Sequence, residues 1–259
     1  MSSYDGRHAE LYDLFYEAKD YESEARFVHD CLDRFAEGPS RRVVDLACGT
    51  GRHALELERL GHEVVGVDHS SSMIDVARRR ATSTGAAARF HLGDLARLDV
   101  PGAPFDAATC LFDSIGYVGS NEALSRTFAG IHATVRPGGL LVFEFWHGAA
   151  MLRDFDPVRV RRWETPAGEV LRISETELDC ERQLAHVRYR VNEHRRDGTF
   201  ASFEETQTNR YFLVQEMALW LTSADFQPLA WLDGFSLDGR VTEKTWHVVA
   251  VARRGTREA

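Results

Sequence analysis

Apolar residues recur every three or four positions near the start of the chain, which is the period of an amphipathic helix. The pattern predicts two helices between Glu10 and about Ala36. It stops at Gly38 and Pro39, and the segment 42–47 (RVVDLA) that follows is typical of a short buried strand. The sequence therefore predicts that two helices precede the first strand of the domain.

Beyond that strand, helical and apolar segments alternate in a regular order. Strands are expected at residues 63–67, 88–92, 105–112 and 140–145, and helices at residues 52–60, 73–80 and 123–135. Such alternation is typical of a parallel sheet covered by helices on both faces. Ligands of these sheets bind beyond the carboxyl ends of the strands, so this part of the chain is the expected catalytic platform.

The pattern changes after Trp146. From about residue 159 to 209 polar and apolar positions alternate with a period of two, and antiparallel strands are expected at 169–177 and 185–193. A helix near 215–224 and strands near 229–232 and 245–252 would complete the first sheet. We therefore expect an α/β fold in three parts: N-terminal helices and a cofactor-binding core (1–150), an inserted antiparallel β-layer that covers the substrate (151–210), and a C-terminal completion of the core sheet (211–259).

Composition narrows the classes of function. The 259 residues are 44% hydrophobic and hold no apolar run of the roughly 20 residues that a membrane-spanning helix needs, so one soluble domain is expected. The first residues lack the pattern of a secretory signal, which favours the cytoplasm. A net charge of -9 argues against nucleic acid and anionic membranes as partners. The four cysteines and the histidines lack the spacing of metal or redox motifs, so we expect free thiols and no metal ion, while a homodimer stays open.

A glycine-rich loop carries the first chemical signal. In the segment 45–51 (DLACGTG), glycines stand where the backbone must turn tightly and approach a ligand. Asp68 lies 17 residues beyond Gly51 at the end of the next expected strand, where its carboxylate can accept both hydroxyl hydrogens of a ribose. Gly49, Gly51 and Ala54 also satisfy a relaxed dinucleotide fingerprint. The loop is therefore compatible with a nicotinamide dinucleotide and with S-adenosylmethionine.

Asp45 separates these two cofactors. A carboxylate before the loop would repel the pyrophosphate of a dinucleotide, whereas it would attract the ammonium and sulfonium of S-adenosylmethionine. We therefore expect S-adenosylmethionine, with an NAD-dependent oxidoreductase as the more distant alternative.

Several motifs together resemble the class I S-adenosylmethionine-dependent methyltransferases in order and spacing, over about residues 10–147: 43–51 (VVDLACGTG), 65–68 (VGVD), 93–95 (GDL), 105–106 (FD) and 136–139 (RPGG). The segments 11–16 (LYDLFY), 112–117 (FDSIGY) and 143–146 (FEFW) are similar to small-molecule N-methyltransferases of nucleotide-linked amino sugars, which carry proline where this chain has Phe145. The resemblance implies N-methylation of an amino sugar or another specialised metabolite, with a small-molecule O-methyltransferase as the alternative. A noncatalytic nucleotide-binding protein is a third possibility.

The same resemblance implies a Rossmann-like sheet whose last strand, near residues 245–252, is antiparallel to its neighbours. It also implies cofactor contacts by position. Those expected are Tyr16 over the cofactor and on its carboxylate, Asp45 and the backbone of Gly49 and Gly51 on the methionyl part, Asp68 on the ribose, Met73 against adenine, Asp94 at the adenine amino group and Leu95 through its backbone, with Ala47, His69 and Leu111 as further cofactor-binding candidates.

The acceptor side needs residues that position a nucleophile and take its proton. Methyl transfer is an in-line displacement in which positioning supplies much of the acceleration, and an amine reacts only after losing its proton. The catalytic candidates are His147, Asp113, Tyr117 and Glu144, and the substrate-binding candidates are Trp146, Arg159, Arg161, Trp163, Arg188 and Arg190. The arginines suit a diphosphate, although cross-strand ion pairs on a solvated sheet face would show the same pattern.

Overall fold

The larger of two β-sheets forms the centre of the molecule in the computed structural model, which describes residues 7–256. The strand order is β10-β11-β5-β4-β1-β2-β3. Strands β1 to β5 pair in parallel wherever they are neighbours, whereas β11 is antiparallel to both β5 and β10. This confirms the α/β sheet with an antiparallel last strand. The strands are β1 (Arg42–Leu46), β2 (Glu63–Asp68), β3 (Arg89–Leu92), β4 (Phe105–Cys110), β5 (Val135–Trp146), β10 (Phe226–Asp233) and β11 (His247–Arg254).

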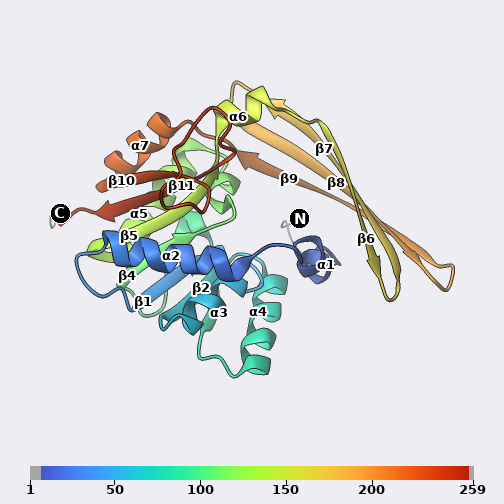
Figure 1. Ribbon diagram of the computed structural model, residues 1–259, viewed down its shortest axis with the longest axis horizontal. Coiled ribbons are helices and arrows are strands. Elements are labelled where there is room, and N and C mark those ends of the chain that lie inside the picture. The colour runs from blue at the N-terminus through green and yellow to red at the C-terminus, as the bar shows by residue number, and fades with distance from the viewer. Residues whose placement is uncertain (1–6, 257–259) are drawn as a thin grey trace.

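Helices cover both faces of this sheet (Figure 1). On one face Phe128 and Met217 belong to the larger apolar cluster, and on the other Val28, Leu57 and Ile74 belong to the second cluster. Each such side chain removed from water contributes roughly 1.5–3 kcal/mol to folding, so the two clusters fix the sheet between the helices. The helices are α2 (Tyr21–Phe35), α3 (Arg52–Arg59) and α4 (Ser71–Thr84) on one face, and α5 (Asn121–Thr134) and α7 (Val214–Ser223) on the other.

A second, four-stranded antiparallel sheet extends away from the core (Figure 1). Its strands lie in chain order: β6 (Val158–Thr165), β7 (Gly168–Asp179), β8 (Leu184–Arg195) and β9 (Phe200–Arg210). The expected segments 169–177 and 185–193 fall within β7 and β8, which confirms the predicted antiparallel layer. The division of the chain at residues 150 and 210 stays a prediction, and the parts of it at residues 1–6 and 257–259 lie outside the described residues.

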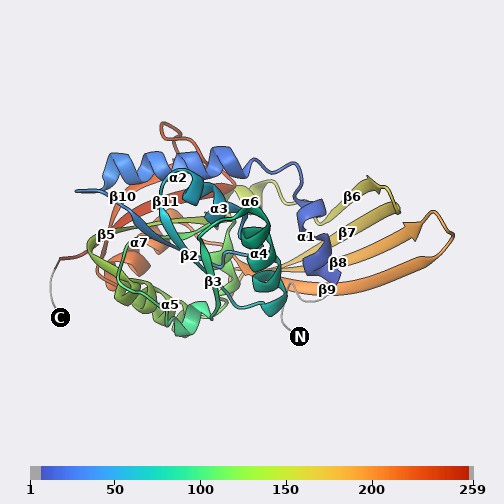
Figure 2. The ribbon, with the colours of Figure 1, turned by 90° about the horizontal axis from the view of Figure 1, so that it is seen from below.

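Helix α1 (Arg7–Phe15) joins the two sheets (Figure 2). Leu11 and Phe15 pack in one apolar cluster with Val170 of β7 and Val191 of β8. On another side of the same helix Tyr12 packs against Met73 of α4. The first helix therefore fixes the second sheet beside the carboxyl ends of the core strands.

The structure adds elements that the apolar pattern did not predict. Strand β6, strand β9 and helix α6 (Gly148–Arg153) were not resolved as separate elements by the sequence, nor were the 3₁₀ turns η1 (Leu95–Arg97) and η2 (Ser114–Tyr117). Within the described residues no helix is both long and apolar enough to cross a membrane. Cys31, Cys48 and Cys110 are buried and Cys180 is exposed, and all four are free thiols.

The contact between η2 and β9 leaves no room for a side chain at Gly116. A Cβ atom there would lie 1.8 Å from Asn209 Oδ1 and 2.7 Å from the carbonyl oxygen of Arg210. Gly116→Ala is predicted to overpack the contact between η2 and β9. The substitution should lower the free energy of unfolding by roughly 1–3 kcal/mol and the Tm by about 3–10 °C. Thermal denaturation followed by circular dichroism measures the change. Gly38→Ala, at an exposed glycine with no atom near its Cβ position, is the control, and equal Tm values for both variants would contradict this packing.

Candidate functional site

The glycine-rich loop between β1 and α3 lies at the carboxyl end of β1, and three of its residues have a left-handed backbone. Ala47, Gly49 and Gly51 have φ angles of 54°, 53° and 77°. A Cβ atom at Gly51 would lie 2.8 Å from the ring of Phe90, so only glycine combines this conformation with close packing against β3. The loop is thereby held against the sheet with its backbone open to a ligand.

Asp68 at the end of β2 holds this loop in place. Its Oδ2 accepts a hydrogen bond from the backbone N–H of Gly49 at 2.8 Å, and its Oδ1 accepts one from the N–H of Ser70 at 2.8 Å. Burial raises the pKa of Asp68, and these two N–H groups oppose that shift. A carboxylate has about four acceptor positions, so the oxygens can also receive hydrogen bonds from ligand hydroxyl groups.

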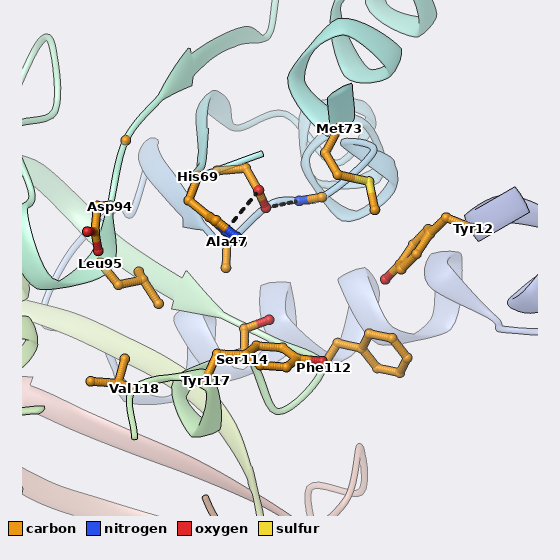
Figure 3. A pocket seen from close by; sticks show the side chains of 13 residues that line it. Tyr12, Ala47, His69, Met73, Asp94, Leu95, Phe112, Ser114, Tyr117 and Val118 are labelled. Carbon is orange, nitrogen blue, oxygen red and sulfur yellow. Dashed lines mark hydrogen bonds and ion pairs between the residues drawn. The ribbon is translucent and has the colours of Figure 1, made fainter. Parts of the chain in front are cut away.

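A cavity of about 230 Å³ opens beside the loop, and we term it the first cavity (Figure 3). Asp94 and Leu95 lie at one end of it, and Tyr12 and Phe112 lie at the other. The wall between them is largely apolar, as a planar aromatic ligand requires. The residues that line it are Tyr12, Ala47, Gly49, Asp68, His69, Met73, Gly93, Asp94, Leu95, Phe112, Ser114, Tyr117 and Val118.

A small recess of about 30 Å³ continues from this cavity behind the loop. Asp45 lies in it, 2% exposed, with Oδ1 accepting a hydrogen bond from Thr109 at 2.9 Å. Its Oδ2 has no hydrogen-bond partner among residues 7–256. Burial raises the pKa of Asp45 to about 6. An ammonium group would satisfy this oxygen, and Arg52, whose guanidinium stacks 4.0 Å from the ring centre of Tyr21 in the same recess, is suited to a carboxylate.

A second cavity of about 220 Å³ lies between the core and the β-layer. It shares Phe112 and Tyr117 with the first cavity, so the two meet at the turn after β4. Its lining combines aromatic rings with arginine side chains, which is typical of a site for an organic anion. Among the residues that line it are Tyr16, Asp113, Trp146, Asp156, Arg159, Arg161, Arg172, Tyr189, Trp246 and His247.

Arg172 on β7 is the most enclosed of these cations. It is 6% exposed, and its Nε and Nη1 have no hydrogen-bond partner among the described residues. Four aromatic rings surround its guanidinium at 4.7–5.7 Å: those of Phe15, Tyr16, Trp163 and Tyr189. A buried guanidinium with unsatisfied N–H groups favours an anionic ligand in the second cavity.

Three titratable groups converge where the two cavities meet. His247 Nδ1 lies 2.8 Å from Asp113 Oδ2 and 3.0 Å from Glu144 Oε1. Glu144 Oε2 also accepts a hydrogen bond from the N–H of Phe112 at 2.7 Å. Phe112 and Asp113 have φ angles of 59° and 54°, and successive left-handed residues other than glycine cost about 1–3 kcal/mol each. Glu144 therefore helps to hold a strained turn.

The structure brings together most of the sequence-predicted cofactor residues. Ala47, Gly49, Asp68, His69, Met73, Asp94 and Leu95 line the first cavity, and Asp45 and Leu111 lie in its recess. Gly51 shapes the loop without lining a cavity. Tyr16 is placed differently from the expectation, because it lies in the second cavity, while Tyr12, one helical turn earlier, lines the first.

The acceptor-side candidates divide into two groups. Asp113, Tyr117, Trp146, Arg159 and Arg161 line the second cavity, and Glu144 lies directly behind Asp113. His147 lines neither cavity: it is 7% exposed, precedes α6, and its Nδ1 lies 3.1 Å from the carbonyl oxygen of Thr245.

Three further candidates also lie outside the lining. Arg188 and Arg190 form ion pairs with Glu175 on the opposite face of the β-layer. Trp163 packs between Phe15 and Arg172 instead of facing the second cavity.

Sequence reasoning did not single out several lining residues. Tyr12, Phe112, Ser114 and Val118 of the first cavity, Arg52 of the recess, and Arg172, Tyr189, Trp246 and His247 of the second are in this group. The period of two along β7 puts Arg172 on the same face as Ser174 and Thr176, and this signal was available. His247 is set by its pairing with Trp146 across β11 and β5, which no local pattern reveals.

Comparisons with known proteins agree with this geometry. A family model described as a methyltransferase domain matches residues 43–139. The dTDP-3-amino-3,6-dideoxy-alpha-D-glucopyranose N,N-dimethyltransferase of Streptomyces fradiae is 32% identical over 195 residues, which are 74% of this chain and 73% of that protein. The dTDP-3-amino-3,4,6-trideoxy-alpha-D-glucopyranose N,N-dimethyltransferase of Streptomyces venezuelae is 34% identical over 55% of this chain, but the match spans only 59% of that enzyme.

Solved structures show the same likeness over nearly the whole length. The sugar N-methyltransferase of a Streptoalloteichus species superposes with a TM-score of 0.80 and 26% identity, covering 98% of this chain and 97% of that one. The likeness therefore includes the β-layer as well as the core sheet.

Asp68→Ala is predicted to raise the dissociation constant of S-adenosylmethionine at least tenfold. The substitution removes a charged acceptor whose hydrogen bonds are each worth roughly 1.5–3 kcal/mol, and it frees the loop at Gly49. Isothermal titration calorimetry measures the change. Asp75→Ala, at an exposed position on α4, is the matched control. An unchanged affinity in the Asp68 variant would remove this residue from the site.

Proposed function

The chain belongs to the class I S-adenosylmethionine-dependent methyltransferases, and from this premise we propose that it methylates the amino group of a sugar linked to a nucleoside diphosphate. The observation that carries the proposal is the meeting of two chemically different cavities at Phe112 and Tyr117. One has carboxylates around an apolar slot, and the other has arginines and aromatic rings. A methyl donor and an anionic acceptor would therefore face each other across one turn of the chain.

Several residues fit S-adenosylmethionine by their chemistry. The unpaired oxygen of Asp45 suits the ammonium of the methionyl part, and Arg52 suits its carboxylate. Asp68 is suited to the ribose hydroxyl groups, and Met73 and Leu95 offer apolar walls for adenine. When bound, the cofactor supplies an electrophilic methyl group on a positively charged sulfur.

The lining of the second cavity supports an anionic acceptor. Arg159, Arg161 and Arg172 contribute three guanidinium groups from β6 and β7, against the two carboxylates of Asp113 and Asp156. Guanidinium groups bind phosphate oxygens in a bidentate manner. The curated relatives named above act on dTDP-linked amino sugars, which carry both the diphosphate and the amine that this arrangement would need.

We propose that most of the acceleration of methyl transfer comes from binding the methyl donor and the acceptor side by side where the two cavities meet. Methyl transfer requires the nucleophile about 3–3.5 Å from the methyl carbon in line with the sulfur, and such positioning supplies roughly 7–11 kcal/mol at best. The strained turn at Phe112 and Asp113, fixed by Glu144, would hold the acceptor in that place. We further propose a cytoplasmic enzyme of specialised metabolism that needs no metal ion.

Incubation with S-adenosylmethionine carrying a ¹³C-labelled methyl group tests this function directly. The acceptor panel contains dTDP-linked 3-amino and 4-amino sugars, the same sugars without the nucleotide, and hydroxyl analogues. The predicted result is a ¹³C–¹H signal at the chemical shift of an N-methyl group on the nucleotide-linked amines alone. Transfer only to hydroxyl groups would indicate an O-methyltransferase, and cofactor binding without any transfer would indicate a noncatalytic binding protein.

Arg172→Gln is predicted to raise the KM of a nucleotide-linked acceptor at least tenfold, because a charge-assisted contact worth roughly 1.5–3 kcal/mol is lost. The affinity for S-adenosylmethionine should stay the same, since Arg172 does not line the first cavity. Steady-state kinetics and calorimetry measure the two quantities. The control is Arg188→Gln on the opposite face of the same layer, and an equal rise of KM in both variants would contradict the assignment.

A further inference from the structure

The cluster of Asp113, Glu144 and His247 has a geometry that the proposed function does not yet use. Asp113 and His247 line the second cavity at the point where it meets the first, and Glu144 stands behind them, 2% exposed. One ring nitrogen of His247, Nδ1, faces both carboxylates at 2.8 and 3.0 Å. Its side chain is 44% exposed, so the ring reaches from the buried carboxylates to the open cavity.

We propose that Asp113 takes the proton of the acceptor's ammonium group before methyl transfer and later releases it to water, and that His247 is the cation beside Asp113 that favours its ionised form. The proposal rests on the proposed function, because only an amine acceptor brings such a proton. Glu144 is a positioning residue: it holds the Phe112 N–H with one oxygen and faces His247 Nδ1 with the other.

The charges of the cluster agree with this division of work. Burial and the neighbouring carboxylate of Glu144 raise the pKa of Asp113 to about 7, against the opposing effect of His247. Burial disfavours a charge on His247, but the carboxylates of Asp113 and Glu144 outweigh it and raise its pKa to about 10. Near neutral pH the aspartate can therefore both accept and release a proton, while the histidine stays charged.

The ammonium gives one proton to a carboxylate oxygen of Asp113, which leaves a neutral amine and a carboxylic acid. The amine lone pair then forms the N–C bond while the electrons of the S–C bond pass to sulfur, yielding a methylammonium and a neutral thioether. Asp113 returns to its carboxylate when it releases this proton to water in the cavity, while His247 keeps both of its ring protons and its charge. A second methylation would need the same removal of a proton.

The groups that face Asp113 come from several elements. Beside it are Glu144 and Trp146 on β5 and His247 on β11. Across the cavity, titratable or charged groups come from η2, from the chain after α1, from the chain before β6, and from β6, β7 and β8: Tyr117, Tyr16, Asp156, Arg159, Arg161, Arg172 and Tyr189.

The test compares the pH dependence of kcat in wild-type enzyme and Asp113→Asn, with saturating cofactor and amine acceptor. At pH 7 the variant should be about 100-fold slower, within the range of general-base effects. The reaction of the variant would then depend on spontaneous loss of the amine proton. The ratio of wild-type to variant kcat should therefore fall about tenfold per pH unit up to the pKa of the amine. His247→Gln should move the acidic limb of the profile to higher pH, because a cation that lowers the pKa of Asp113 is lost.

Asp99→Asn, at an exposed position outside both cavities, is the matched control and should keep the wild-type profile. Calorimetry should show unchanged affinity of Asp113→Asn for S-adenosylmethionine. A deficit that is constant with pH, or no deficit, would overturn the proton assignment while amine methylation by wild type upholds the function. Wild-type transfer to hydroxyl groups alone would overturn the proposed function and this proposal with it. Loss of wild-type activity in EDTA that Mn²⁺ restores would overturn the proposal by making the three groups cation ligands.

Discussion

Four carboxylates are buried at the carboxyl edge of the parallel sheet, and the site depends on how each is compensated. Asp45, Asp68, Asp113 and Glu144 are 2–6% exposed. A buried carboxylate without compensation is costly, so each must receive hydrogen bonds, a nearby cation or a proton. Asp68 receives two backbone N–H groups, Glu144 one N–H and a histidine, and Asp113 the same histidine. One oxygen of Asp45, Oδ2, and one oxygen of Asp113, Oδ1, have no hydrogen-bond partner among the described residues.

Because the four carboxylates have different partners, they are suited to different ligands. Asp45, whose Oδ2 has no hydrogen-bond partner in the described part of the chain, lies where a ligand ammonium would compensate its charge. Asp113 and Glu144, which share His247, lie where an acceptor would react. The guanidinium of Arg172 is the counterpart on the other side of the second cavity, because its Nε and Nη1 groups lack partners within residues 7–256. The core therefore offers negative charge to the methyl donor and the β-layer offers positive charge to the acceptor. Helix α1 fixes the core and the β-layer relative to each other, because it packs on both.

The sequence predicts this site best where local spacing determines position. Asp45, the glycines and Asp68 lie at strand ends that the apolar pattern already marks, so their convergence follows from the parallel sheet. Tyr16 and Tyr12 lie one helical turn apart, with ring centres 4.8 Å from each other, and the pattern could not decide which ring faces which cavity. His147 continues directly from β5 yet turns toward Thr245, whereas strand pairing brings His247 to Glu144, 103 residues earlier in the sequence. The periodicity of apolar residues cannot predict which residues of two distant strands pair with each other.

The central claim is that the unsatisfied charge of Asp45 is completed by the cationic end of S-adenosylmethionine. The most direct measurement is the pKa of the Asp45 carboxyl group by ¹³C NMR, with the signal assigned by comparison with Asp45→Asn, in the free chain and in the complex. The account predicts a value near 6 in the free chain and a fall of more than one unit when the ammonium binds, because a nearby cation favours the ionised form. A value that stays the same in the complex would show that the ligand's cation lies elsewhere and would contradict the account.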